Sequence, residues 1–213
     1  MPTSAVLFSG GLDSAVLLAR ELQGSEDQRG VQPIHVRSGL AWEDAEARTI
    51  ARLLASPPFA GRVAPVVTLT VDMREVYPPS HWAVTGRPPA YDTPDEDVYL
   101  EGRNIVLISK AAVLCARLKI HRLALGPLAG NPFPDATPEF FDTMGRALSL
   151  GLAHDLKIAA PLSTMHKEDV IRLGRELGVP LDLTLSCMNP QADDQPCGQC
   201  SKCRERDQAF SNS

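Results

Sequence analysis

The first residues of the chain constrain its fold more than any other stretch. The apolar run at residues 5–8 predicts a buried strand, and the apolar pattern that begins at Ala15 predicts a helix. A short turn lies between them, Ser9-Gly10-Gly11-Leu12-Asp13-Ser14. Amides in a first helical turn have no partners inside the helix and carry partial positive charge. Because paired glycines also let a ligand approach closely, this stretch predicts a strand, a phosphate-binding loop and a helix.

Asp13 is out of place for anion binding alone, but a carboxylate suits a magnesium ion (Mg2+) that accompanies phosphates. An ordinary turn between strand and helix remains the alternative, because Gly-Gly and Asp-Ser are common in such turns. The loop resembles the PP-loop of the ATP pyrophosphatases, which cut ATP between its α and β phosphates. This resemblance implies ATP as the bound nucleotide.

Four of the five cysteines fall within seventeen residues near the end of the sequence, at Cys187, Cys197, Cys200 and Cys203. Two overlapping CxxC units and one upstream cysteine can close a tetrahedral thiolate site. Zinc (Zn2+) in a structural role is the preferred interpretation, and a disulfide or an iron–sulfur cluster is the alternative. The fifth cysteine, Cys115, lies in an apolar helical pattern and is interpreted as a buried residue without a reactive thiol.

Strand and helix patterns alternate along the chain, which predicts an α/β fold with a parallel sheet covered on both faces. Strands are expected at residues 5–8, 33–37, 63–71, 121–126 and 158–160. Helices are expected at residues 14–22, 41–55, 103–118, 139–152 and 166–177. Residues 72–101 are rich in proline and show no clear period. We expect a nucleotide-binding domain at 1–180, followed by a zinc-binding segment at 181–213.

Three further positions are candidates for ligand contacts because they follow strands or begin helices. Arg103 opens the long helix at 103–118 and can hold a phosphate or a carboxylate with two hydrogen bonds. Lys167 begins the last predicted helix and can reach a phosphate chain. In the helix at 41–55, Ile50 and Leu53 are expected to face the core, and Glu43, Asp44 and Glu46 to face the opposite side.

Composition excludes some functions. The net charge is −5, so a general nucleic-acid-binding surface is not indicated. The sequence shows no signal peptide and no apolar run that could span a bilayer, so we expect a cytoplasmic protein without a membrane partner.

Together, these motifs make the chain similar to the QueC-type 7-cyano-7-deazaguanine synthase family of PP-loop enzymes. The matching features are the first loop, Gly102-Arg103-Asn104, Ser149-Leu150-Gly151 with Lys167, and Ser186-Cys187 with the three later cysteines. The resemblance implies an adenine-nucleotide α-hydrolase-like fold and a zinc ion on the cysteines. It implies that a 7-deazaguanine carboxylate, ATP and ammonia are converted to the nitrile. Asp13, Ser14 and Lys167 would act in catalysis, Asp135 would bind the acceptor, and a homodimer is expected.

The chain also departs from the family pattern in two loops. Arg37-Ser38-Gly39-Leu40-Ala41 replaces the Tyr-Gly-Gln-Arg-His motif, and Asn131–Thr137 keeps only Pro134 and Asp135 of the family's proline-containing loop. A related enzyme that adenylates another carboxylate therefore stays an alternative. A PP-loop sulfur transferase, a tRNA-modifying enzyme or a zinc-bearing interaction module are less consistent alternatives.

Overall fold

The computed structural model describes residues 2–24 and 30–213. Its centre is a sheet of five parallel strands in the order β3-β2-β1-β4-β5. The strands are β1 (Ser4–Leu7), β2 (Val31–Arg37), β3 (Val67–Thr70), β4 (Arg122–Ala124) and β5 (Lys157–Ala159). All five predicted strands are confirmed. The third begins at Val67 rather than at residue 63, since Pro65 interrupts the β-branched run and has no amide hydrogen to donate.

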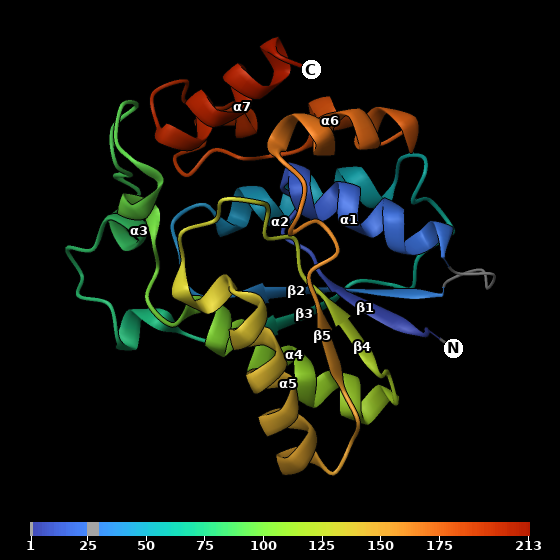
Figure 1. The fold of residues 1–213 in the computed structure, drawn as a ribbon. Coiled ribbons are helices and arrows are strands. Elements are labelled where there is room, and N and C mark those ends of the chain that lie inside the picture. Colours follow the sequence, from blue (N-terminus) through green and yellow to red (C-terminus); the bar gives the residue numbers. More distant parts are fainter. Residues whose placement is uncertain (1, 25–29) are drawn as a thin grey trace.

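Helices cover both faces of the sheet, as Figure 1 shows. One face carries α1 (Leu12–Gln23), α2 (Glu43–Leu54) and α6 (Lys167–Glu176), and the other carries α4 (Arg103–Leu118) and α5 (Pro138–Leu152). Each face has its own apolar core, because helices with one apolar side must bury that side against the sheet. The predicted parallel α/β architecture is therefore confirmed.

Helix α7 (Ser201–Ser211), which packs against α6, was not among the predicted helices. Its residues are mostly charged or polar, and its buried positions are Ser201, Cys203 and Ala209. Such a helix lacks the apolar stripe on which pattern reading depends. Ala209 and Phe210 join the core that contains α1 and α6, while the proposed domain boundary at residue 180 stays a prediction.

Residues 72–101 form a lobe beside the sheet rather than a layer of it. The lobe contains α3 (Trp82–Thr85) and two short 3₁₀ turns, and it packs with the cysteine segment in a third apolar cluster. An isolated antiparallel bridge between Ala90 and Cys200 links the two. The irregular stretch that the sequence predicts therefore covers the cysteine-rich segment.

Gly174 on α6 sits where that helix crosses α1. A Cβ atom added there would lie 2.8 Å from Val16 Cγ2 and 2.8 Å from Leu181 Cδ2. Gly174→Ala should therefore destabilise the fold, because overpacking costs about 1–3 kcal/mol and exceeds the ~1 kcal/mol helix propensity gained. Urea unfolding measures this free energy. The control Gly151→Ala on α5 meets no atom within 4 Å and should be stabilising, so equal stability of the two variants would contradict the packing argument.

Within the described ranges, no helix combines the length and apolar character that crossing a bilayer requires.

Candidate nucleotide-binding site and metal centre

The loop between β1 and α1 has the geometry of an anion cradle. Gly10 has a φ of 77°, a left-handed conformation that favours glycine. The Ser14 hydroxyl donates to the Gly11 carbonyl at 2.9 Å, and the Gly11 amide donates to Ser9 Oγ at 3.3 Å. No side chain caps α1 at Gly11, so the amides of its first turn remain available to a ligand.

Lys167 lies directly against this loop, although 154 residues separate it from Asp13. Its Nζ donates to the two Asp13 carboxylate oxygens at 2.9 and 2.7 Å, and lies 3.0 Å from Glu205 Oε1. Burial alone would lower the pKa of Lys167, but Asp13 and Glu205 outweigh it and raise that pKa. Burial likewise acts to raise the pKa of Glu205, while Lys167 and Lys202 bring it down to about 2. The loop thus adjoins a fixed array of alternating charges.

Two adjoining cavities, of about 290 and 360 Å³, open at the carboxyl ends of the strands. The first is mainly apolar, with walls from β1, β2, α4 and the segment after β4; the second contains Trp42, Trp82, Lys167 and Arg206. Both are lined by the phosphate loop. In open parallel sheets, ligands bind outside the carboxyl ends of the strands where the strand order reverses, here between β1 and β4.

Arg103 begins α4, which bounds both cavities, and Asp135 contacts the next residue of that helix, Asn104. Asp135 Oδ2 accepts the Asn104 backbone amide at 3.1 Å, and Oδ1 accepts Asn104 Nδ2 at 3.2 Å. Burial raises the pKa of Asp135 in spite of these bonds. Arg103 lines both cavities, and its buried Nε has no hydrogen-bond partner among the residues described. Asp135 therefore fixes the start of the helix that carries Arg103; its contact with an acceptor stays a prediction.

Two further polar side chains, His35 and Glu46, line the first cavity and were not among the predicted site residues. His35 is 3% exposed; its Nδ1 lies 3.2 Å from the Phe8 carbonyl, and its Nε2 has no partner within the described part of the chain. Burial lowers its pKa. A histidine within a predicted strand carries no pattern that distinguishes a cavity-lining residue from any other strand residue.

The predicted orientation of α2 is wrong for two of its three acidic residues. Asp44 is exposed, but Glu43 and Glu46 are only 3% and 8% exposed. Glu43 accepts hydrogen bonds from the Ser38 amide and hydroxyl and from the Gly39 amide, and so holds the turn after β2. Glu46 faces the cavities instead. The prediction placed both residues on the solvent side because they are charged. In the structure, the turn after β2 gives Glu43 polar partners inside the protein, and the cavities give Glu46 a polar environment.

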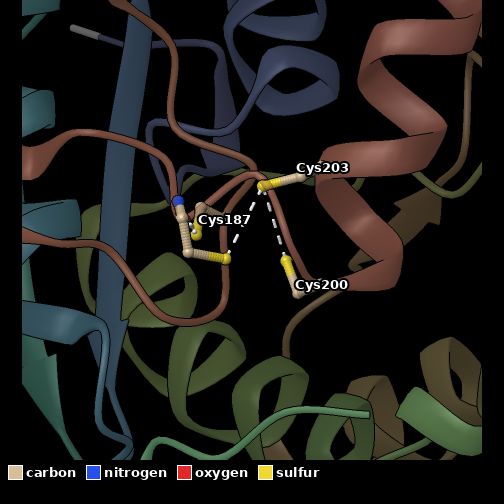
Figure 2. Close-up of side chains that lie close together, drawn as sticks. Cys187, Cys200 and Cys203 are labelled. Carbon is tan, nitrogen blue, oxygen red and sulfur yellow. Dashed lines mark hydrogen bonds between the residues drawn. The ribbon is translucent and has the colours of Figure 1, made fainter. Parts of the chain in front are cut away.

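The four predicted cysteines form a cluster in which all Sγ atoms lie within 4.8 Å of one another. Cys203 Sγ is 3.6 Å from Cys200 Sγ and 4.0 Å from Cys197 Sγ, and Figure 2 shows the labelled side chains pointing toward a common centre. A tetrahedral zinc site with bonds of about 2.3 Å needs sulfurs about 3.8 Å apart. The geometry therefore fits a four-coordinate metal ion, and the predicted metal cluster is confirmed as an arrangement of ligands.

The cysteine segment is also attached to the phosphate loop. The Leu185 amide donates to the Gly10 carbonyl at 3.1 Å, two residues before Cys187. On the other side, Asp194 accepts hydrogen bonds from Arg48 and Arg52 of α2, which outweigh its burial and lower its pKa. The cysteine segment is therefore joined by hydrogen bonds both to the loop after β1 and to α2.

Cys115 lies outside the cluster, inside α4. It is 0% exposed, and burial raises its pKa to about 12. The prediction that Cys115 is buried is confirmed.

The glycine-serine loop after the first strand, the strand order and the paired cavities are those of an α/β protein with the PP-loop fold. The U34-tRNA thiolase NcsA of Methanococcus maripaludis, solved with its [4Fe-4S] cluster, shares this fold at a TM-score of 0.51 and 16% identity, over 84% of this chain and 59% of that one.

The model of the family described as queuosine biosynthesis protein QueC matches residues 3–213, so the chain belongs to this family. Among curated relatives, the 7-cyano-7-deazaguanine synthase of Methanopyrus kandleri is 32% identical over 99% of this chain and 94% of its own length. The enzyme of the same name from Xanthomonas campestris is 32% identical over all of this chain and 94% of its own.

Proposed function

We propose that this protein is an ATP-dependent carbon–nitrogen ligase that converts a 7-deazaguanine carboxylate and ammonia to 7-cyano-7-deazaguanine. The observation that carries the proposal is the meeting of two cavities at one phosphate loop. We assign one cavity to the nucleotide and the other to the acceptor, since the same loop lines both. The relatives named 7-cyano-7-deazaguanine synthase support the choice of acceptor.

The reaction divides into three chemical steps. A carboxylate oxygen attacks the α-phosphorus of ATP, which forms an acyl-adenylate and releases pyrophosphate. Ammonia then displaces AMP and gives an amide. A second ATP activates the amide oxygen, and loss of AMP leaves the nitrile. Each activation builds negative charge on the departing pyrophosphate, and preorganised donors stabilise such charge.

The residues of the loop and its neighbours have distinct roles in this proposal. The first-turn amides and the Ser9 and Ser14 hydroxyls orient the phosphates, while Lys167 and Arg103 supply positive charge. Lys167 Nζ is bonded to Asp13 at the edge of the loop in this structure. When ATP binds, the ammonium group can exchange this carboxylate for the nearby phosphate chain. Asp13 would hold the accompanying Mg2+, which neutralises phosphate charge when bound.

We infer that the metal in the cysteine cluster is zinc with a structural role. Four thiolates leave no open position for a substrate, which distinguishes structural from catalytic zinc. Cys187 and Cys200 have opposite pKa shifts, raised and lowered respectively, because hydrogen bonding between the two thiols favours a proton on the former. A cation at the centre would allow all four sulfurs to lose their protons.

Pyrophosphate release across a panel of carboxylates tests the function. With 7-carboxy-7-deazaguanine, ATP and ammonia, we expect AMP, pyrophosphate and the nitrile. The control is the same mixture without the carboxylate, in which ATP should persist. No pyrophosphate with any member of the panel would reject the proposed function.

A second acceptor is favoured by one observation. Residues 131–137, where this chain departs from the family pattern, border both cavities through Asn131 and Phe133. Another planar carboxylate could therefore be the substrate, adenylated by the same loop. Release of pyrophosphate with a different carboxylate, and none with the deazapurine, would establish this alternative.

Lys167 and Asp135 should differ in their kinetic effects. Lys167→Ala should weaken ATP use with every acceptor, because it removes charge from the phosphate site. Asp135→Ala should raise the KM for the deazapurine far more than the KM for ATP, because a carboxylate can accept hydrogen bonds from the ring N–H groups of the deazapurine. Separate titrations of ATP and acceptor measure both. Unchanged acceptor kinetics in Asp135→Ala would contradict its predicted contact with the acceptor. Its role would then be to hold Asn104 at the start of α4.

A further inference from the structure

Glu46 is a buried carboxyl group that the steps above do not use. It projects from α2, is 8% exposed, and lines both cavities at the phosphate loop. Outside that loop, Arg103 is the only other charged residue among those described that lines both cavities. Where two substrates approach from two cavities, the atoms that react lie at their junction. Glu46 therefore lines the space where the two substrates of the proposed reaction would meet.

We propose that Glu46 is a catalytic residue that takes the proton from the ammonia nitrogen when the amide forms. The proposal rests on the function proposed above and adds a residue to it. In this step the nitrogen lone pair forms a bond to the acyl carbon, and the bond from that carbon to the AMP oxygen breaks. One N–H proton passes to the Glu46 carboxylate, and AMP leaves with the bonding electron pair. The amide, AMP and a neutral Glu46 result.

The surroundings of Glu46 give it suitable acidity for this transfer. Burial raises its pKa to about 7, although Arg103 acts to lower it. A base whose pKa lies near the working pH transfers protons most efficiently. The charged groups that act on Glu46 are Glu43 on the same helix, Arg37 on β2 and Arg103 on α4, and the Trp42 side chain forms a hydrogen bond with it. Its two cavities hold further titratable groups: Asp13, His35, Tyr99 and Asp135 in the first, and Asp13, Lys167, Cys187, Lys202, Glu205 and Arg206 in the second.

The other acidic groups at the site are committed elsewhere. Both oxygens of Glu43 accept hydrogen bonds from the turn after β2, and Asp13 is paired with Lys167. Asp135 caps α4. His35 lines only the first cavity, and its lowered pKa makes the imidazole a weaker base. Glu46 is therefore the group best placed and best suited to receive the proton.

Glu46→Gln keeps the size of the side chain but cannot take a proton. With acceptor and ATP but no ammonia, exchange of pyrophosphate into ATP should stay within about threefold of wild type, since adenylation needs no base. Amide formation from ammonia should fall about 100-fold, the usual contribution of a general base. Hydroxylamine is a stronger nucleophile and is neutral at pH 7, so its reaction should fall far less. Glu46→Asp, which keeps a carboxyl group, should retain intermediate activity.

The pH dependence separates this role from a structural one. In single turnovers with saturating ammonium, the wild-type rate should rise through pH 7 as Glu46 ionises, and Glu46→Gln should lack that rise. Glu43→Gln, the matched control on the same helix, should change both steps equally or neither.

Equal losses of exchange and amide formation in Glu46→Gln would overturn the proposal, as would an unchanged rate with ammonia. Wild-type protein that shows no exchange with any carboxylate would instead reject the proposed function, and this inference with it.

Discussion

Asp13→Ala should reduce the rate of AMP formation by about 100-fold or more, comparable to removing a single electrostatic stabiliser from an active site. Asp13 stands in the first turn of α1, where the helix amides and the cradle of glycine and serine gather phosphate charge. Its loss removes the carboxylate proposed for Mg2+ and frees Lys167 from its ion pair. A continuous assay of pyrophosphate release measures the effect.

Two controls make this result specific. Asp155→Ala removes an exposed carboxylate outside both cavities and should leave the rate unchanged. Asp13→Asn keeps the side-chain shape and should be nearly as slow as Asp13→Ala, since the charge is missing. Wild-type AMP formation in Asp13→Ala would show that the loop is not the site of ATP chemistry.

Cys200→Ser should cause the largest loss of stability, because it removes one of four ligands from a buried metal site. Elemental analysis of the wild type should find about one zinc per chain, and the variant should lose most of it. Since Leu185 joins the cysteine segment to Gly10 of the phosphate loop, loss of metal should also weaken ATP turnover. Thermal unfolding and zinc content, measured on the same samples, provide the test.

Cys115→Ala is the matched control, since Cys115 is a buried cysteine outside the cluster. It should leave the zinc content unchanged and lower stability only modestly, because a small apolar group is lost from the core. Protein that is free of metal and unfolds cooperatively at the wild-type temperature would contradict a structural zinc. Iron and sulfide in place of zinc would show that the cysteines hold an iron–sulfur cluster.

The parts predicted best from the sequence are those whose signal is local. The strand, glycine pair and helix at the first loop occupy consecutive residues, and the cysteine ligands lie within seventeen positions, so spacing alone constrains their geometry. The helix at 103–118 was located for the same reason, as its apolar residues repeat with the helical period. Helix α7 lacks such a repeat and was missed.

The arrangement of the site depended on contacts between distant residues, which no local pattern encodes. Lys167 meets Asp13 because β1 and β5 belong to the same parallel sheet, whose carboxyl ends bring their following loops to one edge. Glu46 is a case in which a local pattern misleads. Its charge predicts exposure to solvent, but its position on α2 places its side chain in a cavity. The sequence by itself determined the five strands, the five main helices that cover them and the chemical groups that these elements carry. Only the tertiary structure decided which groups share a buried space, because that depends on how the helices pack across the sheet.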